Sequence, residues 1–271
     1  MIAEISNGIV FGKSKPFILI AGPCVIENID HPVSMAEQIK KICERLHIPF
    51  IFKCSFDKAN RTSMNHYRGV DIDTANKVFE KIKSELNIPI TTDFHESWQA
   101  NALKDTVDLL QIPAFLCRQT DMLIASAKTG LPINIKKAQF INGADMEKAV
   151  EKVRLSGNEN IVLTERGNIY GYNDYIVDMR NLVIMKQMAP IVFDATHSVQ
   201  QGCSGGSKGC DTQFIEPLAK AAVAVGIDGL FMEVHDDPKK ALSDGASSIV
   251  LANLENILIN LLEITTGGER K

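Results

Sequence analysis

FILIAGPC, at residues 17–24, is a short apolar run that reads as a buried β-strand entering a loop at a cysteine. IVFDATHS at 191–198 and GLFMEVH at 229–235 follow the same plan, with polar side chains at or near the end of each apolar run. In a closed parallel barrel the carboxyl ends of all strands converge on one face, so side chains far apart in sequence can meet there. These three segments therefore predict a parallel barrel with its functional site on that face.

Apolar, β-rich runs recur about every 25–40 residues and alternate with helix-like segments, as expected of a parallel α/β fold. The eight runs lie at residues 17–23, 50–56, 88–95, 109–115, 132–137, 160–167, 191–197 and 229–235. Segments such as 33–46 and 73–86 repeat apolar residues at helical spacing, with charged residues on the other face. The count favours a (β/α)8 TIM barrel of about 250 residues. A doubly wound open sheet is the alternative, but it normally carries a GxGxxG turn after its first strand, and GPCVIEN is not one.

Length and composition predict one large α/β domain rather than two small ones. The chain has 271 residues, of which 45% are hydrophobic, so it can bury a full-sized core. We expect residues 1–271 to form a single barrel domain, with 1–16 as an N-terminal hairpin that turns at Asn7-Gly8 and caps the barrel. The net charge of −4 provides no broad basic field for nucleic acid, so the expected ligands are small phosphates held by local Lys and Arg.

The sequence also predicts a soluble, cytoplasmic protein. Its first residues lack a basic start followed by an apolar stretch, and no apolar run approaches the roughly 18 residues that span a bilayer. Scattered cysteines without an export signal indicate reduced thiols. These are Cys24, Cys43, Cys54, Cys117, Cys203 and Cys210. The pair Cys203 and Cys210 lacks CxxC flanks and is interpreted as incidental to metal binding. The Gly-rich stretch 202–209 between them predicts a mobile lid.

Cations gather at several of the predicted strand ends. KCSFDKANRTS, residues 53–63, offers ammonium, guanidinium and hydroxyl groups that suit a phosphate or a carboxylate. Taken alone, such a loop is more often solvated surface. However, Lys136 ends the fifth strand, Arg166 ends the sixth, and Arg118 follows the fourth, with no equal number of acids nearby in the sequence. Because like charges repel, these cations predict two phosphate sites.

Four residues at or beyond strand ends could bind one divalent metal, namely Cys24, His197, Glu233 and Asp244. Each alone is more often a core, surface or salt-bridge residue. Together, a thiolate, an imidazole and two carboxylates suit Zn²⁺, Fe²⁺ or Mn²⁺ better than Mg²⁺. Asp93 and His95 end the third strand, where they could orient a water or transfer protons, or simply form a structural hydrogen-bond network. Gln111 lies in the fourth strand.

At these residues the chain resembles the 3-deoxy-D-manno-octulosonate 8-phosphate synthase family. The resemblance covers about residues 17 to 245 and rests on the motifs AGPCVIE, FKCSFDKANRTS, TDFHESW, QIPAFLCRQTDML, NIKKAQF, LTERGNIYGYN, DATHSVQ and FMEVHDDPKKALSDG. It implies a tetrameric (β/α)8 transferase that condenses phosphoenolpyruvate with arabinose 5-phosphate and water and releases phosphate. The product would enter lipopolysaccharide synthesis in Gram-negative bacteria.

The resemblance also implies residue roles by position. Phosphoenolpyruvate would be held by Lys53, Lys58, Gln111, Lys136 and Arg166, of which Lys136 and Arg166 hold its phosphate. The aldose would contact Asn60, with its phosphate on Arg61, Thr62 and Arg118 of a neighbouring subunit. The metal ligands would be Cys24, His197, Glu233 and Asp244. Cysteine at the first of these positions implies the metal-dependent class, since metal-independent members have asparagine there. The catalytic candidates are His197, Asp93, His95 and Lys58.

Two other functions compete with this interpretation. The related 3-deoxy-D-arabino-heptulosonate 7-phosphate synthase uses erythrose 4-phosphate and has an aldose motif that resembles KPRTS. The corresponding segment here is KANRTS, in which Ala59-Asn60 replaces the proline and favours the longer sugar. A non-catalytic barrel that senses phosphorylated sugars is the other candidate. It would need the anion sites but not the metal residues, Asp93 or His95.

Overall fold

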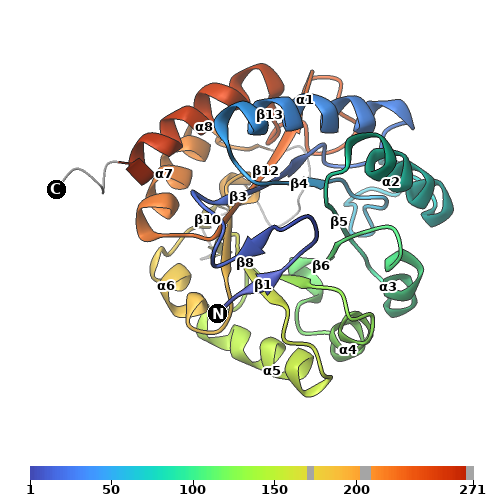
Figure 1. Cartoon of the computed structure of the whole chain (residues 1–271), viewed down its shortest axis with the longest axis vertical. Coiled ribbons are helices and arrows are strands. Elements are labelled where there is room, and N and C mark those ends of the chain that lie inside the picture. The colour runs from blue at the N-terminus through green and yellow to red at the C-terminus, as the bar shows by residue number, and fades with distance from the viewer. Residues whose placement is uncertain (170–173, 202–208, 267–271) are drawn as a thin grey trace.

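Eight parallel strands close into a barrel, which confirms the predicted (β/α)8 TIM fold (Figure 1). The computed structural model describes residues 1–169, 174–201 and 209–266. The barrel strands are β3 (Ile18–Gly22), β4 (Phe50–Lys53), β5 (Ile90–Asp93), β6 (Leu109–Ile112), β7 (Ile133–Lys136), β8 (Ile161–Glu165), β11 (Ile191–Asp194) and β12 (Gly229–His235). They pair in chain order, and β11 also pairs with β12, while β12 pairs with β3. Each strand lies within one of the eight predicted runs.

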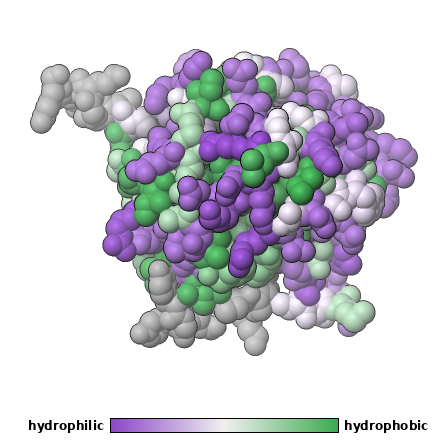
Figure 2. Space-filling view, turned by 90° about the horizontal axis from the view of Figure 1, so that it is seen from below, coloured by the Kyte–Doolittle hydropathy of each residue, from purple (hydrophilic) through white to green (hydrophobic). Residues whose placement is uncertain are grey.

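Helices surround the barrel on its outside (Figure 1). They are α1 (Asp30–Leu46), α2 (Ile72–Leu86), α3 (Ser97–Leu103), α4 (Thr120–Lys128), α5 (Glu147–Leu155), α6 (Arg180–Lys186), α7 (Ile215–Val225) and α8 (Leu251–Thr266). The helix α2 illustrates how the sequence sets their limits: Asp71 accepts a hydrogen bond from the Thr74 amide at its start, and Asn87 adopts a left-handed conformation at its end. On the flank seen in Figure 2, hydrophilic residues predominate between small hydrophobic groups, as amphipathic helices require.

Shorter elements complete the described chain. These are the strands β1 (Ala3–Glu4), β2 (Val10–Phe11), β9 (Asn168–Ile169), β10 (Tyr175–Ile176) and β13 (Ile249–Val250), and the 3-10 turns η1 (Ala114–Leu116), η2 (Ala144–Met146), η3 (His197–Val199) and η4 (Thr212–Phe214). Within the described part of the chain, no helix combines the length and apolarity needed to span a bilayer. The cysteines at 24, 43, 54, 117 and 210 are free thiols. Cys203 and the predicted lid, apart from Gly209, lie outside the described residues.

The N-terminal hairpin packs at the amino end of the barrel. Strands β1 and β2 pair antiparallel, and Asn7 and Gly8 both have the positive φ that a type I′ turn requires. Ala3 and Phe11 share a buried cluster with residues from the barrel strands. Gly229 makes room for this packing, because a Cβ there would lie 2.7 Å from the Phe11 ring. We propose that this continuous packing makes residues 1–271 one domain.

The barrel interior changes character along the strands. Side chains alternate between the inside and the outside of a strand, so Phe231 and Glu233 of β12 face the same way. Near the amino ends, the inward residues are apolar and join the hairpin cluster. Toward the carboxyl ends, the buried side chains include Lys53, Lys136 and Glu233, whose burial requires specific partners. The functional site therefore lies at the carboxyl end.

Candidate active site

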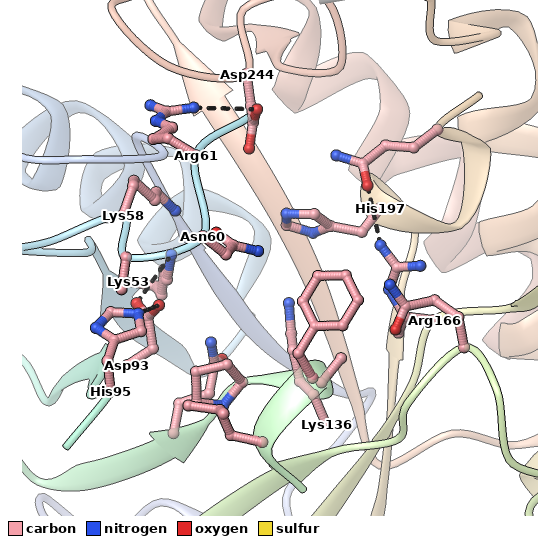
Figure 3. A pocket seen from close by; sticks show the side chains of 18 of the residues that line it. Lys53, Lys58, Asn60, Arg61, Asp93, His95, Lys136, Arg166, His197 and Asp244 are labelled. Carbon is pink, nitrogen blue, oxygen red and sulfur yellow. Dashed lines mark hydrogen bonds and ion pairs between the residues drawn. The ribbon is translucent and has the colours of Figure 1, made fainter. Parts of the chain in front are cut away.

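A cavity of about 310 Å³ opens at the carboxyl ends of the strands (Figure 3). Predicted site residues that line it are Lys53, Lys58, Asn60, Arg61, Asp93, His95, Gln111, Lys136, Arg166, His197 and Asp244. They come from β4, β5, β6 and β7, from the loops after β4, β5, β8 and β12, and from the turn after β11. The sequence therefore predicted correctly that these strand ends meet.

Ser55 connects Lys53, which ends β4, with Lys58, which follows this strand. Its hydroxyl accepts hydrogen bonds from Lys53 Nζ at 2.7 Å and Lys58 Nζ at 2.9 Å, and donates one to Asp93 Oδ1. The hydroxyl thus uses its two acceptor positions and its one proton. Burial alone would lower the pKa of Lys58, but nearby Cys24, Glu233 and Asp93 raise it well above its usual value. The ammonium therefore stays charged and in place to bind an anion.

Asp93 and His95 form the pair that their spacing predicted. His95 Nε2 lies 3.2 Å from Asp93 Oδ2, and His95 Nδ1 has no hydrogen-bond partner among the described residues. Burial opposes ionisation of Asp93, but Lys53, the hydrogen bond from His95 and Lys58 hold its pKa well below the usual range. The charged carboxylate orients the His95 ring, which lines the cavity.

A second ion pair crosses the barrel from β7 to β11. Lys136 Nζ lies 2.5 Å from Asp194 Oδ2, and this same oxygen lies 2.8 Å from His197 Nδ1. Burial would raise the pKa of Asp194, but His197 and Lys136 keep it well below the usual range. Burial also lowers the pKa of Lys136, despite the attraction of Asp194. Lys136 Nζ sits 4.0 Å from the centre of the Phe231 ring, which supports it from the barrel interior.

Arg166 is the cation of this cavity without an acidic partner among the described residues. Its Nη2 donates to Gln200 Oε1 at 2.9 Å, its guanidinium lies 4.3 Å from the centre of the Tyr175 ring, and its Nη1 has no partner there. Beneath it, Lys137 Nζ lies 3.3 Å from Glu165 Oε1 with both side chains fully buried. Burial lowers the pKa of Lys137, although Glu165 opposes this. The Lys137–Glu165 pair fixes the chain at the end of β8. Arg166 keeps Nη1, which has no partner among the described residues, for an anion.

The residues of the predicted aldose site divide into two groups. Asn60 and Arg61 line the cavity, and Arg61 Nη1 lies 3.8 Å from Asp244 Oδ1. Thr62 and Arg118 are exposed and lie outside the cavity lining. Arg118 instead lines a separate cavity of about 260 Å³ with Lys148 and Lys152. One chain alone therefore does not bring every predicted aldose contact together.

The expected surplus of cations was overstated. The sequence argument counted acids only near each cation, whereas the barrel supplies them from distant strands. Lys53 lies 3.7 Å from Asp93 and 3.8 Å from Glu233, and Lys136 pairs with Asp194. Arg166 and the unfilled volume between the paired groups still favour an anionic ligand.

Three of the four predicted metal ligands converge beside this cavity. One ligand atom from each of Cys24, Glu233 and Asp244 lies within 4.8 Å of the others. His197 is outside this closest group, but its Nε2 lies 3.5 Å from Glu233 Oε1. Gly22 allows the approach of β3 to β4, because a Cβ there would lie 2.0 Å from the Lys53 carbonyl oxygen.

The donors in this group fit a metal ion. Glu233 is fully buried, and neither of its carboxylate oxygens has a hydrogen-bond partner among the described residues. The pKa of the Cys24 thiol is raised well above its usual value by burial and by Asp244 and Glu233. Asp244 has φ 47°, and its carbonyl accepts hydrogen bonds from the Ser247 and Ser248 amides. A cation would stabilise the thiolate and both carboxylates at once.

Sequence reasoning missed five polar residues of the site: Ser55, Asp194, Gln139, Tyr175 and Gln200. A signal existed for the first two. Ser55 stands two residues after Lys53 and so faces the same side of its strand, and Asp194 ends an apolar run as Asp93 does. Gln139 lies in the loop after β7, Tyr175 in the two-residue strand β10 and Gln200 directly after η3, where no periodicity marks the residues that face a ligand.

Comparison with known proteins identifies the family. The model of the DAHP synthetase I family matches residues 1–269. The chain is 50% identical over 265 residues to the 2-dehydro-3-deoxyphosphooctonate aldolase of Cyanothece sp., covering 97% of each chain. It is 53% identical over 257 residues to that of Koribacter versatilis, covering 93% of this chain and 92% of the relative. It is 52% identical over 257 residues to that of Rickettsia prowazekii, covering 94% of each.

The name of these relatives denotes the synthase family that the sequence motifs resemble, so the resemblance is confirmed. With a match over almost its whole length, the chain belongs to the DAHP synthetase I family.

Proposed function

We propose that the chain condenses phosphoenolpyruvate with D-arabinose 5-phosphate and water to give 3-deoxy-D-manno-octulosonate 8-phosphate and phosphate. The observation that carries this proposal is one cavity with cations on opposite sides, Lys136 and Arg166 on one and Lys58 and Arg61 on the other (Figure 3). Two anionic substrates can lie between them. The relatives named 2-dehydro-3-deoxyphosphooctonate aldolase support the same reaction.

The proposed reaction places one substrate at each end of the cavity. Arg166, whose Nη1 has no partner among the described residues, and Lys136 would hold the phosphate of phosphoenolpyruvate, while Lys53, Lys58 and Gln111 would hold its other end. The aldose lies toward Asn60 and Arg61, with its phosphate also held by Thr62. Cations that are fixed before the substrates arrive offset the repulsion between two phosphates. They also orient the reacting carbons, which lowers the entropic part of the barrier.

The reaction forms a carbon–carbon bond at carbon 3 of the enol phosphate and a carbon–oxygen bond from water at carbon 2, and it breaks the bond between carbon 2 and the phosphate oxygen. Carbon 3 attacks the aldehyde carbon of the sugar, whose oxygen takes up a proton, and water adds to carbon 2. The resulting hemiketal phosphate loses inorganic phosphate through C–O cleavage. The His95 ring, oriented by Asp93, would move protons to and from water, and His197 would couple a bound water to this transfer. Lys58 stabilises negative charge as it develops.

A divalent metal completes this site. Cys24, Glu233 and Asp244 would hold it, with His197 as the fourth ligand after a small approach. A thiolate–imidazole–carboxylate set suits Zn²⁺, Fe²⁺ or Mn²⁺. When bound, such an ion polarises the aldehyde or positions a water. Asp194 orients His197 through Nδ1 and so leaves Nε2 for this role.

The place of the reaction in the cell and in an assembly is also part of the proposal. The chain would work in the cytoplasm as a homotetramer, and its product would supply lipopolysaccharide synthesis. Neither nucleic acid nor membrane is a partner. Arg118, exposed and away from its own chain's cavity, would reach the sugar phosphate in a neighbouring subunit.

A phosphate-release assay tests the proposed function. Metal-stripped protein is given phosphoenolpyruvate with either arabinose 5-phosphate or erythrose 4-phosphate, and Zn²⁺, Fe²⁺ or Mn²⁺ is added back. Release that requires arabinose 5-phosphate supports the proposal. Release with erythrose 4-phosphate alone would assign the shorter sugar. Binding of both substrates without turnover under any metal would indicate a sensor rather than an enzyme.

Aldose specificity should be large. Asn60 lines the cavity where the shorter-sugar relatives have proline, and it offers an amide to the longer chain. Arabinose 5-phosphate should therefore exceed erythrose 4-phosphate in kcat/KM by on the order of a hundredfold, since polar groups of the site lose partners with the shorter sugar. Steady-state kinetics with both aldoses measures this ratio. Equal efficiencies would contradict the assignment of Asn60.

Arg118→Ala should raise KM for arabinose 5-phosphate, with little change in KM for phosphoenolpyruvate. Only the aldose would lose a charge-assisted contact, and the expected change is about tenfold or more. Arg45→Ala is the control, because Arg45 is an exposed arginine that pairs with Glu255 on the helical side.

Subunit mixing tests whether Arg118 acts in a neighbouring subunit's site. Hybrids of Arg118→Ala and Lys136→Ala subunits rebuild an intact site wherever a wild-type Arg118 meets a wild-type Lys136 cavity. Regained activity after exchange indicates sharing. With arabinose 5-phosphate well below the KM of Arg118→Ala, confirmed hybrids that release phosphate no faster than the unexchanged parents would place Arg118 outside any shared site.

A further inference from the structure

A second group of possible metal ligands lies outside the catalytic cavity. Glu27 follows β3, His31 lies in the first turn of α1, and His235 ends β12. One ligand atom from each of the three lies within 4.8 Å of the others. None of them lines the catalytic cavity or belongs to the group of Cys24 and Asp244. The proposed reaction therefore gives this cluster no role.

One carboxylate lies beside both histidine rings. Asp236 Oδ1 lies 3.0 Å from His31 Nε2 and 3.0 Å from His235 Nδ1. The other nitrogen of each ring, His31 Nδ1 and His235 Nε2, has no hydrogen-bond partner among the described residues. His235 is only 4% exposed, and its Nε2 lies 3.3 Å from Glu27 Oε1. A buried imidazole nitrogen without a hydrogen bond, close to a carboxylate, is expensive unless another ligand binds it.

The charges around the cluster also favour a cation. Within the described residues, the ion pairs of Glu27 and Asp236 are with these two histidines, and neither acid pairs with Lys or Arg. The histidine ring centres are 4.7 Å apart, so protonating both rings would place two like charges together. One divalent ion compensates both carboxylates without that repulsion.

We propose that Glu27, His31 and His235 form a second metal site for a borderline divalent transition ion such as Zn²⁺ or Co²⁺. Two imidazoles and a carboxylate are typical ligands for such ions, and water would fill the remaining positions. Asp236 would act on the ring nitrogens that face away from the metal, as carboxylates commonly do for metal-bound histidines. The Asp237 amide donates to His235 Nδ1 at 3.0 Å, which places the ring proton on Nε2. Metal binding at Nε2 would shift that proton to Nδ1, which would then donate to Asp236 in place of accepting from the Asp237 amide.

The site would join two segments that also carry ligands of the group Cys24, Glu233 and Asp244. Glu27 lies three residues after Cys24, and its Oε1 accepts a hydrogen bond from the Leu242 amide at 2.8 Å. Leu242 in turn lies two residues before Asp244. An ion bound by Glu27 and His235 would restrain the segments 24–27 and 235–244 against each other, which is a structural role rather than a catalytic one.

Metal stoichiometry tests the proposal. Chelated wild-type protein, His31→Asn, Cys24→Ala and the control His66→Asn are dialysed against Zn²⁺, and bound metal is measured by elemental analysis. His66 is exposed and belongs to neither ligand group, so its replacement makes the same chemical change elsewhere. We expect two equivalents in the wild type and in His66→Asn, and one in each of His31→Asn and Cys24→Ala.

Co²⁺ spectra assign each equivalent. Thiolate-to-cobalt absorption should vanish in Cys24→Ala and persist in His31→Asn. Bound cobalt that lacks this absorption should persist in Cys24→Ala and be lost in His31→Asn. Loss of one equivalent with His31→Asn supports the second site even if Cys24 binds nothing, so the two metal proposals fail separately. His31→Asn that binds as much Zn²⁺ as His66→Asn overturns it. Circular dichroism checks folding, and Glu27→Gln, expected to lose the same equivalent, replaces His31→Asn if that variant is unfolded.

Discussion

Exhaustive chelation is expected to abolish phosphate release, and Zn²⁺, Fe²⁺ or Mn²⁺ should restore it. The physical reason is Glu233, whose fully buried carboxylate has no hydrogen-bond partner on either oxygen within the described residues. Cys24 adds a thiol whose raised pKa keeps it protonated until a cation displaces the proton. Metal affinity should therefore fall as pH is lowered. The measurement is turnover against metal content determined by elemental analysis.

Substitutions at Cys24 sharpen this prediction. Cys24→Ala removes a ligand and should lose nearly all activity, whereas Cys24→Asn should retain more, because metal-independent members of the resembled family have asparagine there. Cys43→Ala is the control, since Cys43 is a buried thiol of α1 whose pKa burial raises to about 12 and which belongs to neither metal group. Full turnover of wild-type protein with no metal detected would contradict the metal requirement.

The barrel could be predicted because its signals are local. Each strand is visible in the sequence as an apolar run, and the polar residues at the end of the run mark the carboxyl end of the barrel. Lys53, Asp93, Lys136 and Arg166 all follow this pattern and all line the cavity. The hairpin was predictable for the same reason, since Asn7-Gly8 is itself the turn signal.

The partners of these residues could not be predicted, because partnership depends on the closure of the sheet. Lys53 ends β4 and Glu233 lies in β12, far apart in the sequence. Because β3 pairs with both strands, the two side chains come to 3.8 Å from each other. His197 was grouped with the metal ligands by position alone. In the structure its Nδ1 is held by Asp194 and its Nε2 lies 3.5 Å from Glu233 Oε1, so the ring stands beside the closest ligand group rather than within it.

The ion pair of Lys136 and Asp194 gives the second large prediction. Lys136→Met should lower kcat/KM by on the order of 10²–10³, because it removes a fixed positive charge from the proposed phosphate site. It should also destabilise the fold by about 3–5 kcal/mol, since it leaves the fully buried Asp194 without its lysine. Phosphate release and urea unfolding measure the two effects. Lys186→Met is the control, because Lys186 is 46% exposed in its pair with Asp228 and should change little.

The double variant Lys136→Met/Asp194→Asn separates catalysis from stability. Asparagine keeps an oxygen for the Thr196 and His197 amides that Asp194 now accepts from, but it removes the unpaired charge. The double variant should therefore be more stable than Lys136→Met alone, because replacing both members of a buried pair avoids stranding one of them. Its activity should stay low, since the phosphate still lacks Lys136 and His197 loses the carboxylate that orients it. If activity recovered along with stability, Lys136 would be a structural partner of Asp194 rather than a ligand for phosphate.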